Sequence, residues 1–455
     1  MGKTDLASLA GVIYALFLLY AVARLFRKST SGAIDFIVAS RGLTLPAFTA
    51  SLVTTWYGGI LGVGEYTFSY GVSNWLVFGL PYYLYAAVFA LFLAARSRRS
   101  EVLTVPDLLE RNFGRPAALA GAGMMFIMTV PAAYVLMLGV LFNFTTGWPL
   151  WVGVVLGTAL SVSYVYRGGL KAVVATDIVQ FFLMFLGFLI LVPVCVFKFG
   201  GWSFLVENLP AGHLKWDGGL GVQAIAVWYF IALSTLVEPA FYQRCFAAKT
   251  EKVARSGIFT AIGLWMFFDF LTTTAGLYAR AVLPDLANPV QAFPALAAHV
   301  LPPFLQGVFT VAMLATIMST VDSYAFICAV TLGRDVVGRW RGKLGDDDDE
   351  SLPLIRLSLT VTAILAVVMA LLSESVVDLW KILGSLGTPV LFGPLMLAHK
   401  GKRLDGARTA GVMVASGLTA GLWLLFGGGD PWLGVEAIFP GLLVSALGLW
   451  WATRS

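Results

Sequence analysis

Charged residues are scarce in this chain of 455 residues, because Asp, Glu, Lys and Arg together make up only 12% of it. A soluble domain usually carries about a quarter of its residues as charges. Apolar residues reach 59%, and apolar runs of roughly 20 residues, the length that one helix needs to cross a bilayer, recur along the chain. The composition therefore argues against a soluble protein and predicts an all-α integral membrane protein.

Cysteine and histidine are also rare, with three residues of each. Cys195, Cys245 and Cys328 lack the spacing of a disulfide framework or a metal clip. The histidines lie far apart in sequence, so none are paired as haem or zinc ligands would be. We therefore expect no transition-metal site and no enzyme activity. The net charge of +5 is explained by basic loops beside the lipid bilayer, so we expect no nucleic-acid partner.

Thirteen apolar stretches are long enough to span a membrane. The first is interpreted as a retained helix, because its basic residues follow the apolar run, whereas a secretory signal carries its charge before that run. The predicted spans cover approximately residues 7–26, 45–66, 73–95, 117–143, 148–166, 175–198, 221–243, 257–283, 300–333, 354–373, 376–399, 408–427 and 433–453.

The basic residues of the loops predict the orientation of the chain. If the N-terminus lies outside, most of the 30 basic residues fall in loops on one side, among them Arg96, Arg167, Arg244 and Arg454. Basic loops stay in the cytoplasm. The pattern predicts a multi-pass protein of the plasma (inner) membrane with its N-terminus outside and its C-terminus in the cytoplasm. The acidic run from Asp346 to Glu350 then lies in a cytoplasmic loop.

Two predicted spans contain breaks. The second span has four glycines within residues 58–64, and the seventh contains Glu238 followed by Pro239. Glycine and proline both disfavour a continuous helix. Interrupted helices at matching positions of two halves point to the binding site of a transporter. The alternative is that the glycines only permit close packing and the proline only kinks its helix.

Hydroxyl groups line one face of the ninth span, where Thr316, Ser319, Thr320 and Ser323 follow helical spacing. Hydroxyl and carbonyl oxygens are the ligands that a small alkali cation needs, and a broken second span would supply carbonyls. The alternative is that these hydroxyls bond to carbonyls of their own helix or hold helices together.

Asp177 lies just inside the sixth span, and a carboxylate at membrane depth is costly and usually functional. Its alternative role is a cap at the N-terminus of that helix. Glu65, Glu238, Asp269 and Asp322 are further carboxylates near membrane depth. Each is a candidate for the ion pathway, for contact with a solute, or for a structural pair.

Four segments together resemble the sodium/solute symporter family. Residues 166–180 (YRGGLKAVVATDIVQ) match its most specific signature, and residues 104–110, 242–249 and 318–323 match three others. The resemblance implies a LeuT-type fold with two inverted five-helix repeats. The first repeat is expected at residues 45–198 and the second at residues 221–399, with one extra helix before them (1–44) and two after (400–455).

The resemblance also implies a Na⁺ site between the second and ninth spans, with Asp177 on the sodium pathway. The implied sodium ligands are the hydroxyls of Ser319 and Thr320 and the carbonyls of Thr316, Thr54 and Tyr57, with Thr55 and Gly58 as alternatives to the last two. The candidate solute-binding residues are Trp56, Gly58, Glu65, Trp228 and Glu238.

The expected function is sodium-coupled import of a small organic solute by alternating access. Amines, amino acids, sugars and carboxylates are all open. Trp56 resembles the aromatic residue with which choline-type members contact a cation through its ring face, yet Glu238 stands where those members have a second tryptophan. The alternatives are proton coupling through Asp177, Glu65 or Glu238, and a membrane sensor that does not transport.

Overall fold

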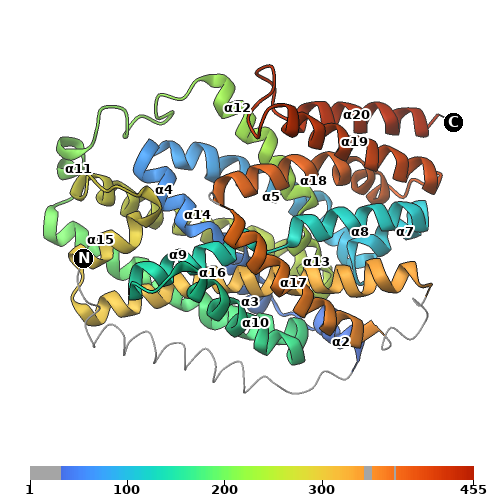
Figure 1. Ribbon diagram of the computed structural model, residues 1–455, viewed down its shortest axis with the longest axis horizontal. Coiled ribbons are helices and arrows are strands. Elements are labelled where there is room, and N and C mark those ends of the chain that lie inside the picture. The colour runs from blue at the N-terminus through green and yellow to red at the C-terminus, as the bar shows by residue number, and fades with distance from the viewer. Residues whose placement is uncertain (1–31, 343–350, 374–375, 455) are drawn as a thin grey trace.

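The computed structural model describes residues 32–342, 351–373 and 376–454, with the side chains of residues 376–381 left out, and most of these residues are helical. The helices run side by side along the long axis of the molecule (Figure 1). The predicted first span at residues 7–26 and the acidic run from Asp346 to Glu350 lie outside the described residues. The predicted total of thirteen spans therefore stays a prediction.

The helices follow the order of the predicted spans. In the first half they are α2 (Ala33–Val38), α3 (Leu45–Trp56), α4 (Ile60–Tyr70), α5 (Leu80–Phe92), α6 (Ala94–Arg99), α7 (Val105–Phe113), α8 (Arg115–Thr129), α9 (Ala132–Thr146), α10 (Leu150–Phe199) and α11 (Trp202–Asn208). In the second half they are α12 (Val222–Ile231), α13 (Pro239–Ala247), α14 (Glu251–Val282), α15 (Ala292–Val300), α16 (Pro303–Val330), α17 (Leu352–Leu372), α18 (Val376–His399), α19 (Gly406–Phe426) and α20 (Ile438–Ala452).

Among the described residues, nine helical segments are long and apolar enough to cross a membrane. This number is lower than the predicted thirteen for four reasons. The first predicted span lies outside the described residues, helix α10 covers two predicted spans, α20 has only 15 residues, and the second predicted span is divided into α3 and α4. An integral, multi-pass helical protein is thus confirmed.

Gly169 divides the long α10 into its two predicted spans. Its φ of 54° and ψ of −147° lie outside the helical region, in a conformation that favours glycine. A Cβ atom at this position would lie 2.5 Å from the carbonyl oxygen of Phe36 in α2. The sequence predicts a loop of several residues here, but one glycine is sufficient to redirect the helix.

Both predicted helix breaks are present, and they differ in form. Between α3 and α4 the chain forms a 3₁₀ turn, Tyr57–Gly59, rather than an extended segment. Between α12 and α13 a 3₁₀ helix, Ala232–Val237, leads to Glu238, whose backbone is extended before Pro239 starts α13. Proline suits the first turn of a helix, because no intrahelical partner awaits its missing N–H there.

Helix α16 lies at the centre of the molecule, where it packs against α10, α3 and α9 (Figure 1). Every residue from Ala315 to Val330 is buried. Polar side chains in this stretch therefore need partners inside the protein, because burying them without hydrogen bonds is costly. Those partners define the candidate site.

Candidate functional site

The hydroxyl-bearing face of α16 meets α3 at the helix break. Thr320 donates a hydrogen bond to the backbone carbonyl of Thr55, with an O–O distance of 2.8 Å. Gly58 lies directly against the same side chain, since a Cβ atom at Gly58 would come within 2.0 Å of the Thr320 hydroxyl oxygen. The two helices thus approach this closely only because residue 58 has no side chain.

One turn of α3 further towards its N-terminus, three helices meet at the carboxylate of Asp177. Ser319 of α16 donates to Asp177 at 2.6 Å, and Ser51 of α3 donates to it at 2.5 Å. All three side chains are fully buried. Asp177 therefore accepts hydrogen bonds from two neighbouring helices and does not act as a cap for its own.

Among the remaining residues predicted to supply sodium ligands, Thr54 and Thr316 have hydroxyls that bond within their own helices, whereas the Tyr57 hydroxyl bonds to Asp269 of α14. The hydroxyl of Thr54 bonds to the carbonyl of Ala50 at 3.0 Å, and that of Thr316 bonds to the carbonyl of Ala312 at 2.7 Å. The carbonyl of Thr54 accepts the backbone N–H of Tyr57 in the 3₁₀ turn. The second span offers two candidate pairs of carbonyl ligands, Thr54 with Tyr57 and Thr55 with Gly58. Thr55 and Gly58 are the residues that lie against Thr320.

Arg244 belongs to this cluster, and the topology argument assigns it wrongly to a loop. It lies on α13 and its side chain is fully buried. Its guanidinium donates to the hydroxyls of Thr55 at 2.8 Å, Ser323 at 2.5 Å and Ser51 at 3.2 Å. The signal was present in the sequence, since Arg244 follows Pro239 by little more than one helical turn and so lies near membrane depth.

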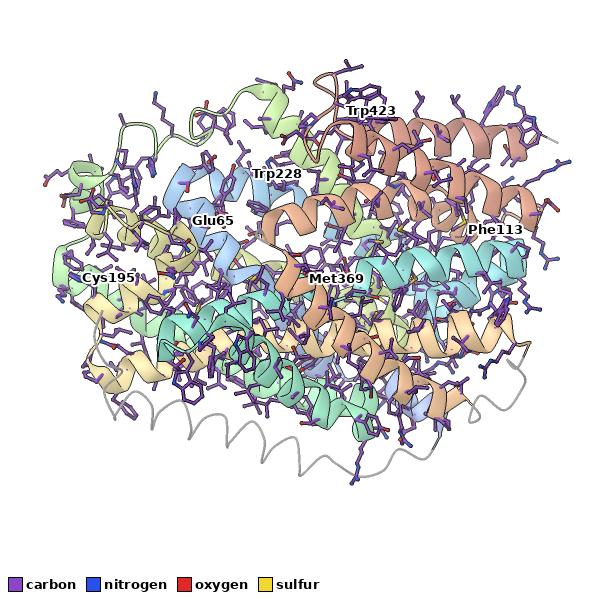
Figure 2. The ribbon with its side chains drawn as sticks, viewed as in Figure 1. Glu65, Phe113, Cys195, Trp228, Met369 and Trp423 are labelled. Atoms are coloured by element: carbon purple, nitrogen blue, oxygen red, sulfur yellow. The ribbon has the colours of Figure 1, made fainter. Side chains whose placement is uncertain are left out.

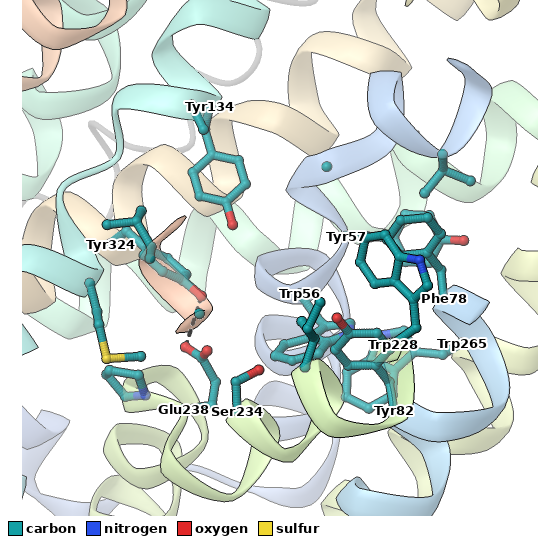
Figure 3. Close-up of a pocket in the computed structure, with 18 of the residues that line it drawn as sticks. Trp56, Tyr57, Phe78, Tyr82, Tyr134, Trp228, Ser234, Glu238, Trp265 and Tyr324 are labelled. Carbon is teal, nitrogen blue, oxygen red and sulfur yellow. Dashed lines mark hydrogen bonds between the residues drawn. The ribbon is translucent and has the colours of Figure 1, made fainter. Parts of the chain in front are cut away.

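A cavity of about 200 Å³ adjoins the break. Figure 3 shows Glu238, Ser234 and Tyr324 on one side of it, and Trp56, Trp228, Trp265 and Tyr82 on the other. The described residues that line it come mainly from α3, the 3₁₀ turn Tyr57–Gly59, α5, α9, α12, α14 and the segment around Glu238. They are Trp56, Tyr57, Gly59, Val63, Phe78, Tyr82, Tyr83, Met128, Val130, Ala133, Tyr134, Trp228, Ile231, Ser234, Glu238, Pro239, Trp265, Asp269, Tyr324, Leu383 and Gly384.

Aromatic rings form much of the cavity wall. The ring centre of Trp56 lies 5.7 Å from that of Tyr82 and 5.9 Å from that of Trp265. Trp228 packs on Phe78 with ring centres 4.6 Å apart. Such a wall offers π faces to a ligand, and π faces attract cations.

Two carboxylates supply the charge in the cavity. Glu238 accepts a hydrogen bond from the Tyr324 hydroxyl at 2.8 Å, and Asp269 accepts hydrogen bonds from the hydroxyls of Tyr57 and Tyr83. Neither carboxylate forms a salt bridge with another described residue, and no described Lys, Arg or His lines the cavity. The described lining of the cavity is therefore acidic and aromatic.

Only some of the candidate solute-binding residues line the cavity. Trp56, Trp228 and Glu238 line the cavity, whereas Gly58 packs on Thr320. Glu65 lies on α4, half-buried and not among the lining residues; Figure 2 labels it together with Trp228. Tyr82, Tyr83 and Tyr324 line the cavity without having been singled out, because a tyrosine in a membrane span carries no distinctive sequence signal.

Comparison with known proteins identifies the family. The sequence pattern of the "Sodium:solute symporter family" matches residues 36–415. The chain is similar to the osmoregulated proline transporter OpuE of Bacillus subtilis, with 28% identity over 92% of this chain and 89% of that protein. It is also similar to the human high affinity choline transporter 1, with 25% identity over 94% of this chain and 78% of that protein.

A solved structure shows the same fold. A Na⁺-coupled sialic acid symporter in a substrate-bound, outward-open state matches with a TM-score of 0.82 and 16% identity, over 98% of this chain and 97% of that one. This likeness confirms a LeuT-type fold, and at this identity it concerns the fold alone. Because the family pattern covers most of the chain, this protein belongs to the sodium:solute symporter family and is a sodium-coupled transporter of a small solute rather than an enzyme.

Proposed function

We propose that sodium binds where α3 and α16 meet, between the 3₁₀ turn and the hydroxyls of Ser319 and Thr320. The contact of Thr320 with Thr55 and Gly58 supports this place, and it favours the carbonyls of Thr55 and Gly58 over those of Thr54 and Tyr57. A hydroxyl that donates its proton to a carboxylate keeps its lone pairs free for a cation. Ser319 has this arrangement with Asp177.

We propose that the solute occupies the aromatic cavity and is an amine that carries a positive charge. The observation that carries this proposal is the cavity lining, which holds Glu238 and Asp269 and no described basic side chain. A solute with a net negative charge would meet two carboxylates in a medium of low dielectric constant, where repulsion is strong. A cationic amine would gain from a carboxylate and from the ring faces of Trp56 and Trp228.

We propose further that transport follows alternating access between two repeats, residues 45–198 and 221–399. The broken segments α3–α4 and α12–α13 would then move together against α10 and α16, with the cavity between them. The N-terminus is proposed to lie outside and the C-terminus in the cytoplasm, as the basic loops suggest. Entry of one sodium ion supplies about 2.3 kcal/mol per 100 mV of membrane potential.

The solute proposal is tested by thermal-shift measurements on the purified protein. Amines, amino acids, sugars and carboxylates are compared with and without sodium. We expect cationic amines to stabilise the protein, and to do so more strongly in sodium than in potassium. A neutral sugar or a dicarboxylate that stabilises the protein more than any amine would contradict the proposed solute class.

The sodium proposal is tested by uptake of the best solute into proteoliposomes. Replacing Ser319 and Thr320 together by alanine should abolish sodium-stimulated uptake while the protein still inserts and folds. Uptake that persists when potassium replaces sodium at fixed pH, and that follows a proton gradient instead, would favour the proton-coupled alternative. Unchanged sodium dependence in the double variant would reject the proposed site.

A further inference from the structure

The guanidinium of Arg244 occupies a set of oxygen atoms of the kind that bind alkali cations. It donates hydrogen bonds to the hydroxyls of Ser51, Thr55 and Ser323. The side-chain amide oxygen of Gln243 accepts another at 2.8 Å. Hydroxyl and amide oxygens are hard ligands suited to such ions. Here a side chain of the protein itself supplies the cation.

The same guanidinium is positioned against the negative charge of Asp177. One of its nitrogens lies 3.6 Å from a carboxylate oxygen of Asp177, and both side chains have no exposed surface. A buried charge that loses its partner is strongly destabilising. The ionised form of Asp177 is therefore stabilised by a cation nearby, and in this conformation Arg244 is that cation.

Two shared residues connect this cluster to the proposed sodium site. The hydroxyl of Thr55 accepts a hydrogen bond from Arg244, and the carbonyl of Thr55 accepts one from Thr320. Asp177 pairs with the guanidinium of Arg244 and also accepts a hydrogen bond from Ser319, a proposed sodium ligand. A sodium ion at Ser319 and the docked guanidinium would both be attracted by Asp177 and would repel each other.

The two charges also sit on different moving parts in the proposed cycle. Arg244 lies on α13, directly after the break at Glu238, whereas Asp177 and Ser323 lie on α10 and α16. A tilt of α13 at the break, with α3 still packed on α16, would withdraw the guanidinium and leave Asp177 with no positive partner. A sodium ion could then take over that role.

We propose that Arg244 is a tethered cation that alternates with sodium as the counter-charge of Asp177. When Arg244 is docked, Asp177 is already neutralised and sodium affinity is low, which promotes sodium release. When α13 carries Arg244 away, Asp177 raises the affinity for sodium. This inference rests on the proposed sodium site, and it adds that the sodium affinity is set by a residue outside the coordinating set.

Sodium titrations on the purified protein test this inference without a transport assay. Trp56 and Trp265 lie close to the site, so intrinsic fluorescence is followed against NaCl, with KCl keeping the ionic strength constant. We expect Arg244→Gln to bind sodium at least about tenfold more tightly than the unmodified protein, because the competing charge is gone. Net uptake should fall, since sodium then leaves slowly.

Three variants separate competition from simple bracing of the helices. Asp177→Asn combined with Arg244→Gln should lose the gain in affinity, because the carboxylate that attracts both cations is absent. Arg244→Lys, whose three N–H donors cannot serve all three hydroxyls and the Gln243 amide oxygen together, should tighten sodium binding by a smaller factor. Arg280→Gln, which removes a cation stacked on Phe68 away from this cluster, should leave sodium affinity unchanged.

Unchanged or weaker sodium binding in Arg244→Gln would overturn the inference and leave Arg244 as a brace. If that variant does not fold, Arg244→Lys carries the same test, and no change in its sodium affinity would overturn the inference equally. The Ser319 and Thr320 double variant distinguishes the two proposals. Should sodium binding be lost there while Arg244 has no influence, the sodium site stands and only the tethered cation fails.

Discussion

The hydroxyl of Thr320 in α16 donates a hydrogen bond to the backbone carbonyl of Thr55 in α3, 2.8 Å away, and so joins two helices whose contacting residues lie 265 positions apart in the sequence. Thr55 lies two residues before the 3₁₀ turn that interrupts the second span. The contact thus places a hydroxyl and a backbone carbonyl side by side at membrane depth. Both are groups that a sodium ion can use in place of water.

Thr320→Val should weaken sodium binding, because valine keeps the shape of threonine and removes only its oxygen. We expect the sodium concentration for half-maximal uptake to rise about tenfold, the effect of losing one ligand worth about 1.4 kcal/mol. The matched control is Thr310→Val on the same helix, since Thr310 bonds only to Gln306 of its own helix. An equal effect of both variants on sodium dependence would contradict the assignment.

Gly58→Ala should disrupt the junction of α3 and α16. The new Cβ atom would lie 2.0 Å from the Thr320 hydroxyl oxygen, so one helix must shift. We expect a lower melting temperature and loss of sodium-stimulated uptake. The control is Gly263→Ala on α14, where no heavy atom lies within 4 Å of the added Cβ and alanine favours the helix by about 1 kcal/mol. A fully active Gly58→Ala protein would show that the close approach is not required.

Glu238→Gln should impair recognition of a cationic solute by removing a negative charge from the cavity wall. We expect KM for the amine to rise at least about tenfold, as the loss of a buried charged partner implies, with sodium affinity retained. Glu207→Gln on α11 is the control, since Glu207 is exposed and outside the cavity. A variant with unchanged KM would remove Glu238 from the solute site.

Trp228→Ala should also raise KM, because the side chain supplies a ring face to the cavity. A desolvated cation over a tryptophan gains about 2 kcal/mol, so the affinity should fall roughly thirtyfold at most. Trp216→Ala is the matched control, since Trp216 is 68% exposed and does not line the cavity. The measurement is the concentration dependence of uptake; equal KM values for the two variants would show that Trp228 does not contact the solute.

Asp107→Asn should destabilise the fold at the end of α16. Asp107 of α7 forms ion pairs with Arg334 at 2.8 Å and with Arg339 at 2.6 Å. Arg334 lies in the π-helix η6 (Thr331–Gly338), and Arg339 directly follows it. Both arginines are buried, although the pattern of basic residues predicts that they lie in a loop. We expect the free energy of unfolding to fall by about 3 kcal/mol, the loss typical of a buried ion pair.

The pair of half-buried Arg98 and exposed Glu101, 4.0 Å apart, provides the control for this measurement. Glu101→Gln should cost less than about 1 kcal/mol, as exposed ion pairs do. Burial alone would raise the pKa of Asp107, but Arg334 and Arg339 outweigh it and hold that pKa below its usual value. The stabilisation is therefore present above pH of about 3.9 and is lost as the pH falls through the lower folded pKa. A melting temperature that rises on acidification through this window would contradict the assignment.

The sequence alone determined which segments become membrane helices and where two of them break. A helix at membrane depth must satisfy its backbone hydrogen bonds within itself, so long apolar runs, the glycines of residues 58–64 and the dipeptide at Glu238 carry this information locally. The family signature then indicated which helices meet. These features depend only on neighbours along the chain. Within the described residues the structure agrees with the order of the helices and with both breaks, but it has no loop around Gly169, and the predicted span at residues 7–26 stays a prediction.

The tertiary structure decided which partner each polar side chain has. Thr316 and Ser319 are one helical turn apart, yet Thr316 bonds to its own helix and Ser319 to Asp177. The sequence places Arg244 close behind Pro239, but only the packing of α3, α10 and α16 shows which side chains its guanidinium contacts. A hydrogen bond between residues far apart in sequence depends on the positions of whole helices, and the packing of whole helices sets those positions rather than any local motif.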